Sequence, residues 1–379
     1  MRGVFLVRHY MDTQTGMKQS GFSIVELMIA VVIGLIVLAG AIQVVINTKQ
    51  NRIEQDEVAF IQDNARFAVE LISNEIRMAG YMGCASPASA QTANSISDSL
   101  GGFIGFGGIE GYDGETSVSG FPTVINTVAK VGTDALIVRR GENRGELSVK
   151  SHNTSAATIH LWAQHSYPRG TTLMITDASC RNVGLFQMSA PNSVPADNIV
   201  HNTGSVTTNC TKSVKADTSF VCTSACTALK CPTSATVGYG AGSKVMSYSG
   251  SAFFIADSAL YSGVPVLKRQ VVDIAATGGT RSEELALGVE DMELQFGVDT
   301  DADNDVNQYR KASQMDVDSN GTINSADWDK VKSVRVSMTF RSQNPVLSAN
   351  QSRLLNGVTY NDKYLRQAVT FTVAIRNRS

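Results

Sequence analysis

The sequence has little charge and none of the short motifs that mark common enzyme families. Charged residues make up 17% of the 379 residues, and the formal net charge is −2 at pH 7. A nearly neutral chain lacks the basic surface that nucleic-acid binding requires, so nucleic acid is not expected as a partner. The G-x-S-x-G, H-E-x-x-H and P-loop patterns are also missing, and the histidines are scattered. We therefore expect no enzyme activity, and we expect Trp162 and Trp328 to be packing residues.

One long apolar segment lies near the amino terminus. Its position relative to the small residue that precedes it differs from that in a cleaved secretory signal. The segment runs from Phe22 to Ile46, and Glu26 is its one charged residue. About 20 apolar residues in a helix are enough to span the hydrocarbon core of a bilayer. A secretory signal places its small-residue cleavage site after the apolar region, whereas here Gly21 precedes it. A cut after Gly21 therefore leaves the apolar helix on the mature protein.

Glu26 is the residue of this segment that calls for a function. A charged residue at the centre of a bilayer costs roughly 2.5–3.5 kcal/mol on insertion scales, so such residues usually serve binding or assembly. A new amino terminus at Phe22 would supply the opposite charge. The alternative is a plain signal anchor in which Glu26 lies near the membrane interface by accident.

The heptapeptide Gly-Phe-Ser-Ile-Val-Glu-Leu that begins at Gly21 resembles the class III signal of type IV prepilins. The resemblance implies that a membrane prepilin peptidase cuts between Gly21 and Phe22 and methylates the amino group of Phe22. It also implies that Glu26 pairs with the amino terminus of a neighbouring subunit during assembly. Residues 1–21 are then the leader. Because the five residues from Met17 alone form a typical short leader, translation is expected to start there.

The helix is expected to continue well beyond the apolar segment. In residues 47–79, apolar and small side chains recur at steps of three and four, which is one face of an α-helix. Gly80 follows, as glycine often does just past a helix end. We therefore assign residues 22–83 to an amino-terminal helix, with residues 22–46 crossing the membrane.

Residues 84–379 are expected to form one β-rich head. Short runs of β-branched and aromatic residues alternate with turn residues, with no helical pattern between them, which predicts an antiparallel sheet. The clearest runs are residues 135–138, 158–162, 172–175, 184–188, 252–255, 264–267, 292–296, 334–338 and 369–375. The Gly- and Ser-rich residues 86–120 are expected to be a long surface connection. The predicted fold class is α+β, with the helix packed on the sheet.

Landmarks in the head are similar to one branch of the prepilins, the PilW-like minor pilins. They are residues 77–84, 132–138, 287–299 and 369–378. The resemblance thus reaches both ends and the middle of the chain, whereas residues 190–250 match nothing in it. It implies the type IV pilin-like fold, a long amino-terminal helix with a membrane-spanning first half packed on an antiparallel β-sheet head.

The same resemblance implies a function in pilus assembly. The chain would be a minor pilin that co-assembles with other minor pilins, initiates pilus assembly and forms the tip complex. The pilus would serve adhesion and twitching motility. Expected partners are the other minor pilins, the major pilin, the prepilin peptidase, the inner-membrane assembly platform and a tip adhesin. The precursor would cross the inner membrane once, with its head in the periplasm, before it enters the extracellular pilus.

Two other functions fit the same sequence features. A minor pseudopilin of a type II secretion system uses the same helix and a similar sheet. A membrane-tethered periplasmic enzyme or adhesin that never polymerises belongs to a different class, in which Glu26 would have no assembly role. Loss of surface fibres on deletion would favour the pilus, whereas loss of exoprotein secretion would favour the pseudopilin.

Acidic residues gather between residues 299 and 327, the one stretch with the pattern of a metal site. Residues 316–327 fit the twelve-residue calcium loop, with oxygen ligands at fixed positions and Gly321 at the sharp turn. The expected calcium ligands are Asp316, Asp318, Asn320, Thr322, Asn324 and Asp327. The competing interpretation is a set of solvated turns in which Asp and Asn side chains bond their own backbone.

A less complete copy of this pattern precedes it. Its candidate calcium ligands are Asp299, Asp301, Asp303 and Asp305. The last position of this copy is Arg310, which cannot bind a cation, so we expect a weaker or differently closed site. Without cations the clustered carboxylates would repel one another and leave the loop mobile, whereas calcium would make it rigid. Calcium is the one cofactor that the sequence suggests.

All six cysteines follow the apolar segment. Basic residues outnumber acidic ones before that segment, which places the head on the periplasmic side, where disulfides form. In the family that the chain resembles, a disulfide commonly ties head to helix, which implies the pair Cys84–Cys180. The other four, in an insert at about residues 205–235, are Cys210, Cys222, Cys226 and Cys231. They allow three pairings that the sequence does not rank, and a zinc cluster is a disfavoured rival in this compartment.

Overall fold

The computed structural model describes residues 21–87, 89–97, 102–114, 120–204, 208–215, 218–222, 237–272 and 279–378. Their contacts divide the chain into two units, one that ends at Gln55 and one that begins at Asp56. The prediction of a start at Met17 falls outside the described residues, and so do Cys226 and Cys231.

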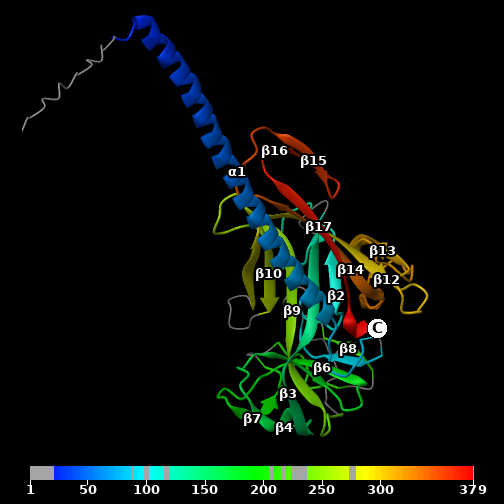
Figure 1. Cartoon of the computed structure of the whole chain (residues 1–379). Coiled ribbons are helices and arrows are strands. Elements are labelled where there is room, and N and C mark those ends of the chain that lie inside the picture. The colour runs from blue at the N-terminus through cyan, green and yellow to red at the C-terminus, as the bar shows by residue number, and fades with distance from the viewer. Residues whose placement is uncertain are drawn as a thin grey trace, which may run out of the picture. The chain divides into compact units, whose positions relative to one another are not determined.

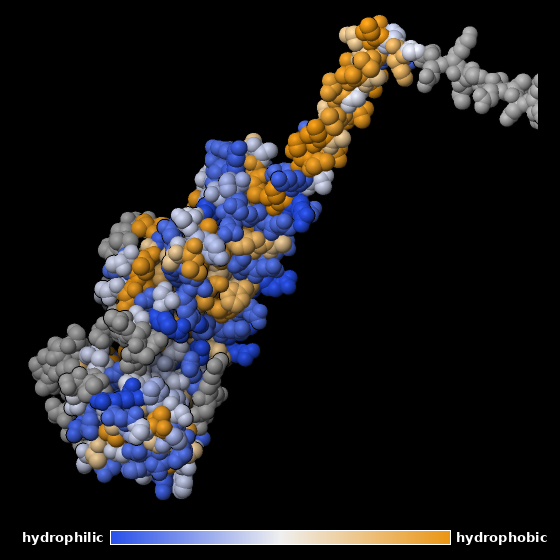
Figure 2. Space-filling model, turned by 90° about the vertical axis from the view of Figure 1, so that its left-hand side faces the viewer, coloured by the Kyte–Doolittle hydropathy of each residue, from blue (hydrophilic) through white to orange (hydrophobic). Residues whose placement is uncertain are grey.

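The described part of the first unit is α-helix from Ile24 onward. Helix α1 spans Ile24–Met78, so the predicted long amino-terminal helix is present, and its part up to Gln55 belongs to this unit. Every residue from 21 to 49 is exposed, including all of the large apolar side chains of the segment. The hydrophobic colour of this segment is plain in Figure 2. An apolar surface of this extent is expected to be covered by lipid or by other proteins.

The second unit holds the remainder of α1 and the strands. Among the described residues these are β1 (Gln91–Asn94), β2 (Ile109–Tyr112), β3 (Ala135–Asn153), β4 (Thr158–His165), β5 (Thr172–Thr176), β6 (Asn182–Gln187), β7 (Ala196–Val200), β8 (Phe220–Val221), β9 (Lys244–Asp257), β10 (Pro265–Val272), β11 (Thr280–Leu287), β12 (Val289–Val298), β13 (Gln308–Arg310), β14 (Val331–Arg341), β15 (Gln351–Leu355), β16 (Val358–Asp362) and β17 (Arg366–Ala374). Short helical turns are η2 (Ala312–Gln314), α2 (Ser325–Trp328) and η3 (Arg376–Arg378).

The strands form two main sheets and a hairpin (Figure 1). The larger sheet has the order β7-β4-β3-β9-β5-β6-β1-β8, with β2, β10 and β11 attached beside it. The smaller sheet has the order β13-β12-β14-β17, and β15 pairs with β16. In the described part of the head, all strand pairs are antiparallel except that β1 runs parallel to β6 and to β8. The prediction of one purely antiparallel sheet is therefore corrected, because β1 reaches this sheet through a long connection rather than a tight turn.

Within the second unit, α1 packs on the smaller sheet. Ala68, Ile72 and Ile76 are fully buried, and the predicted spacing of three and four residues along this helix face is confirmed. They share one core with β12, β14 and β17, where the register places Leu294 beside Val336 and Val336 beside Phe371. Full burial of a side chain such as Ile72 or Ile76 stabilises the fold by about 1.5–3 kcal/mol.

The prediction that residues 86–120 are a surface connection is wrong. This segment contains β1 and β2, and Ile96 and Phe103 in it are fully buried. The buried guanidinium of Arg139 holds the glycine-rich part, since it donates to the carbonyls of Gly102 and Gly107. The glycines here allow the backbone to pack closely around other groups, a use that composition alone does not distinguish from flexibility.

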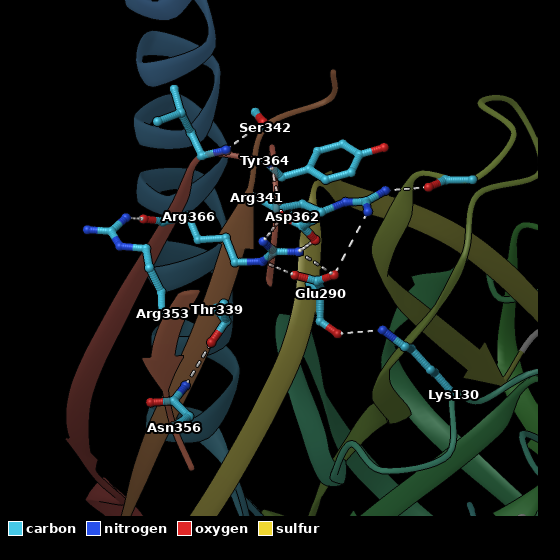
Figure 3. A network of polar contacts seen from close by, with 12 residues as sticks. Lys130, Glu290, Thr339, Arg341, Ser342, Arg353, Asn356, Asp362, Tyr364 and Arg366 are labelled. Carbon is cyan, nitrogen blue, oxygen red and sulfur yellow. Dashed lines mark hydrogen bonds and ion pairs between the residues drawn. The ribbon is translucent and has the colours of Figure 1, made fainter. Parts of the chain in front are cut away.

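The β15–β16 hairpin is tied to the smaller sheet by a network of ion pairs (Figure 3). Arg366 stands at its centre, with Nε 2.7 Å from Glu290 Oε2 and Nη1 2.6 Å from Asp362 Oδ1. Arg341 reaches the same Glu290, with 3.8 Å between Nη1 and Oε1. These contacts join strands β12, β14, β16 and β17, so the hairpin has a fixed attachment on the head.

Candidate functional site

The first candidate site is the amino-terminal end of α1. Phe22 is exposed and precedes the helix, and Glu26 lies in the first turn, where a carboxylate also interacts favourably with the helix dipole. The amide of Leu27 donates to the carbonyl of Ser23 at 3.1 Å, which closes this turn. Phe22 and Glu26 are thus about one helical turn apart in the chain. By length and composition, α1 can cross a membrane.

The second candidate site is the acidic loop from Asp316 to Asp327. Asp316, Asp318 and Asp327 each place a carboxylate oxygen within 4.8 Å of the others. The loop is folded by its own side chains, since Asp316 accepts hydrogen bonds from the amides of Asn320 and Gly321. Gly321 has φ +85°, the left-handed conformation that the sharp turn of a calcium loop requires. Carboxylates gathered in this way could hold a hard cation such as calcium.

The end of this loop is fixed by helix α2. Asn324 is its amino-terminal cap, with Oδ1 accepting from the amide of Ala326 at 2.8 Å. Burial alone would raise the pKa of Asp327, but hydrogen bonds from the amides of Asn324, Val317 and Asp318 hold it below the usual value. Asp327 is therefore kept as a carboxylate, the form that binds cations. The side chains of Asn320 and Thr322 are hydrogen-bonded to each other.

The first acidic loop differs from the second because a lysine already lies on it. Asp299, Asp301 and Asp303 bring carboxylate oxygens within 4.8 Å of one another, and Asp305 is not part of that group. The Lys332 ammonium lies 3.8 Å from Asp299 Oδ2 and 2.8 Å from the side-chain oxygen of Asn304. No local sequence pattern predicts this contact, because Lys332 lies on β14, far along the chain. Its charge offsets part of the repulsion that a cation would otherwise relieve.

The disulfide Cys84–Cys180 is present, with 5.3 Å between the two Cα atoms. It ties the segment after α1 to the turn that follows β5. Cys210 and Cys222 are both disulfide-bonded. Because Cys226 and Cys231 lie outside the described residues, the pairing in the insert stays open.

The two tryptophans behave differently. Trp328 packs as predicted, with its ring 5.0 Å from that of Phe296 in an edge-on contact. Trp162 is 67% exposed on β4, so the prediction of a packing role is wrong for it. Its position on the solvent side of an alternating strand explains this, and Lys150 lies 5.3 Å above its ring. Among the histidines, His152 and His201 lie together and are buried or half-buried.

A cavity of about 300 Å³ lies between the acidic loop and the glycine-rich segment, and the sequence did not predict it. Ile323 and Trp328 contribute one wall, and Glu110 and Arg139 contribute the other. Arg139 and Glu110 form an ion pair there, with 2.5 Å between Nη2 and Oε2. Segments far apart in the sequence build this cavity, so no local pattern could reveal it.

Comparison with known families finds two matches. A family model described as Type IV Pilus-assembly protein W matches residues 252–377. A second, described as the prokaryotic N-terminal methylation motif, matches residues 16–42. Residues 252–377 are thus PilW-like, and residues 16–42 carry a prepilin-type signal. The resemblance stated from the sequence is thereby confirmed. No curated protein and no solved structure matches the chain.

The two matches cover the candidate sites unequally. The methylation-motif match contains Gly21, Phe22 and Glu26. The PilW match contains the smaller sheet, both acidic loops and the β15–β16 hairpin. Most of the larger sheet precedes the PilW match, in the part of the chain that includes residues 190–250. The two matches therefore place the chain in a type IV pilus context without assigning its place in the fibre.

Proposed function

We propose that this PilW-like chain is a minor type IV pilin, which co-assembles with other minor pilins to initiate the pilus and form its tip complex. The observation that carries the proposal is the apolar, exposed first part of α1 behind a prepilin-type signal. Such a helix can reside in the membrane as a precursor and later bury its surface against equivalent helices in a fibre. Glu26 would then pair with the amino terminus of a neighbouring subunit.

Two features support a minor rather than a major subunit. The match to the pilus-assembly protein W family points to assembly rather than to the fibre body. The head is also large, since it extends from about residue 84 to the end of a chain of 379 residues. A head of this size is difficult to repeat along a slender fibre but fits at its end. We further propose that the head reaches the periplasm first and the cell exterior after assembly, and that its fold is pilin-like.

The amino terminus of the assembled protein tests this proposal. Surface fibres would be sheared from cells, and the chain in the fibre fraction analysed by mass spectrometry. N-methylated Phe22 in that fraction is the expected result, because it requires both processing and assembly. A processed chain confined to the cell envelope would favour the type II pseudopilin instead. A chain with residues before Phe22 still attached would refute both.

The role of Glu26 separates assembly from simple membrane tethering. Glu26→Gln removes the charge but keeps the size, so the variant should enter the membrane normally and be strongly depleted from the fibre fraction. Gln43→Leu, which changes a polar residue of the same segment, is the matched control and should assemble normally. If Glu26→Gln assembled as well as the control, the chain would be a tethered protein whose function lies in its head alone.

We also propose calcium as a ligand of the second acidic loop. The converging carboxylates of Asp316, Asp318 and Asp327, together with the turn at Gly321, support this assignment. For the first loop we propose at most weak binding, because the Lys332 ammonium already lies beside Asp299.

A further inference from the structure

Strand β17 is an edge strand without the bulge, the proline and the lysine that commonly prevent pairing. Among the described residues it pairs with β14 alone, and the order β13-β12-β14-β17 ends with it. Its ladder with β14 runs over nine residue pairs without a bulge. It has no proline or lysine, and its one charged residue, Arg366, is held by Glu290 and Asp362. Natural edge strands usually carry such features, since a bare edge pairs with other chains.

The hydrogen bonds show which backbone groups of β17 are directed outward. At the two ends of the ladder, the amide of Ser342 donates to the carbonyl of Leu365, and the amide of Ile375 donates to the carbonyl of Lys332. In an antiparallel ladder, hydrogen-bonded and non-hydrogen-bonded pairs alternate. The register therefore leaves the N–H and C=O groups of alternate residues pointing away from β14. These residues are Ala368, Thr370, Thr372 and Ala374, together with Arg366, whose carbonyl already accepts a hydrogen bond from Arg353 Nη1.

A cavity lies beside this edge and supplies side-chain contacts for an added strand. It has a volume of about 400 Å³ and opens between α1 and β17, which run side by side in Figure 1. Val69 of the helix and Val369 of the strand give it apolar walls. Both are only partly buried against the core of the head, so they retain apolar surface for a partner.

The helix wall of this cavity is basic on balance. It carries Arg66 and Arg77 against the single carboxylate of Glu70. In the described part of the chain, neither arginine is in an ion pair, and Arg77 makes only a long contact of 3.5 Å with Asn74. An added segment with a carboxylate next to its apolar residue would pair with these guanidiniums. Backbone pairing would supply affinity, and the cavity would select the side chains.

From these observations we infer that β17 is a docking edge for an extended segment of another subunit of the pilus assembly. The segment would add to β17 as a fifth strand of the smaller sheet, with an apolar side chain over Val69 and Val369 and a carboxylate against Arg66 or Arg77. This inference rests on the proposed function, because it takes the partner from the same assembly. It goes further by naming the surface, the mode of recognition and the chemistry of the segment.

Hydrogen exchange of single amides tests the inference. The full-length chain would be compared in detergent micelles and in the sheared pilus fraction. The outward amides of Ala368, Thr370 and Thr372 should exchange freely in micelles and at least about ten-fold more slowly in the pilus fraction. The amides of Val369 and Phe371, which bond to β14, serve as internal controls and should be slow in both.

A proline scan at the same edge gives an independent test. Thr372→Pro removes an outward N–H without removing a bond to β14, and edge strands tolerate such prolines. It should lower the amount of chain in the pilus fraction at least about five-fold relative to Thr372→Ala, at equal membrane levels and with a similar melting temperature. Equal incorporation of the two variants would overturn the inference.

The outcomes separate this inference from the proposed function. If the wild-type chain is missing from the pilus fraction, both fall. If it is present but its outward β17 amides exchange as fast as in micelles, the docking edge falls and the proposed function stands. Should Thr372→Pro prove unstable, the exchange of the wild-type amides still decides the question.

Discussion

The Nε2 atom of His152 lies 2.9 Å from the Nε2 atom of His201 in the larger sheet of the head. The amide of Tyr239 donates to His152 Nδ1, so the proton of the neutral His152 ring is on Nε2 and is donated to His201. His201 then carries its proton on Nδ1, which has no hydrogen-bond partner in the described part of the chain. The pair thus joins β3 and the segment after β7 to the chain that returns from the cysteine-rich insert.

This pair makes the stability of the head depend on pH. Burial lowers the pKa of His152 to about 4, and burial with the neighbouring His152 lowers that of His201 to about 3, from an ordinary value of 6.5. As pH falls below 6.5, both histidines become protonated in the unfolded chain but stay neutral in the folded one, which favours the unfolded chain. The contribution of this pair to the free energy of unfolding should therefore be constant near pH 7.5 and fall by about 2–4 kcal/mol between pH 6.5 and pH 4. Asp134 and Asp291 act in the opposite direction, because burial raises their pKa values to about 8 and about 6, so the contribution of the pair is read from the difference between wild type and a variant without the two rings.

Denaturant unfolding of the full chain in micelles at several pH values checks this. The double variant His152→Asn/His201→Phe keeps an acceptor for Tyr239 and removes both titrating rings, so its unfolding free energy should decline less over the same range. His160→Asn, at an exposed histidine, is the control and should keep the wild-type slope. A double variant with an unchanged slope would assign the acid sensitivity to other groups.

Arg366 should be among the most sensitive residues of the head. Its side chain is only 3% exposed and neutralises Glu290 and Asp362 (Figure 3). Arg366→Met would leave Asp362 without its cation and Glu290 with only the longer contact to Arg341, and the unfolding free energy should fall by about 3 kcal/mol. Arg281→Met, in an exposed ion pair with Glu283, should change it by less than about 1 kcal/mol. Denaturant unfolding monitored by tryptophan fluorescence measures both free energies. Similar losses of unfolding free energy in the two variants would contradict this account.

The Cys84–Cys180 disulfide should stabilise the head mainly by restricting the unfolded chain. The two cysteines are 96 residues apart in the sequence, which makes the closed loop long. Cys84→Ala/Cys180→Ala should lower the unfolding free energy by about 2–5 kcal/mol, measured in the same assay under oxidising conditions. Because the insert keeps its own cysteines, the comparison isolates this bond. An unchanged unfolding free energy would mean that the folded contacts alone fix this junction.

Features encoded locally could be predicted from the sequence, and those encoded by distant segments could not. The buried face of α1 follows from spacing alone, as Ala68, Ile72 and Ile76 show. The second acidic loop follows from ligand spacing within a single turn. By contrast, the parallel pairing of β1, the contact of Lys332 with Asp299 and the burial of Phe103 depend on residues far apart in the chain. No local pattern encodes such contacts.

The two acidic loops should respond differently to calcium. The full chain in micelles, stripped with chelator, should melt at a higher temperature after calcium is added, by an amount equivalent to about 2.7 kcal/mol at 100 times the dissociation constant. Asp316→Asn/Asp318→Asn should abolish this rise, because it removes two of the three converging carboxylates. Asp301→Asn/Asp303→Asn should keep most of it, since the Lys332 ammonium already partly neutralises the first loop at Asp299. An undiminished rise in the first variant would leave solvated turns as the better account of residues 316–327, and an abolished rise in the second would move the calcium site to the first loop.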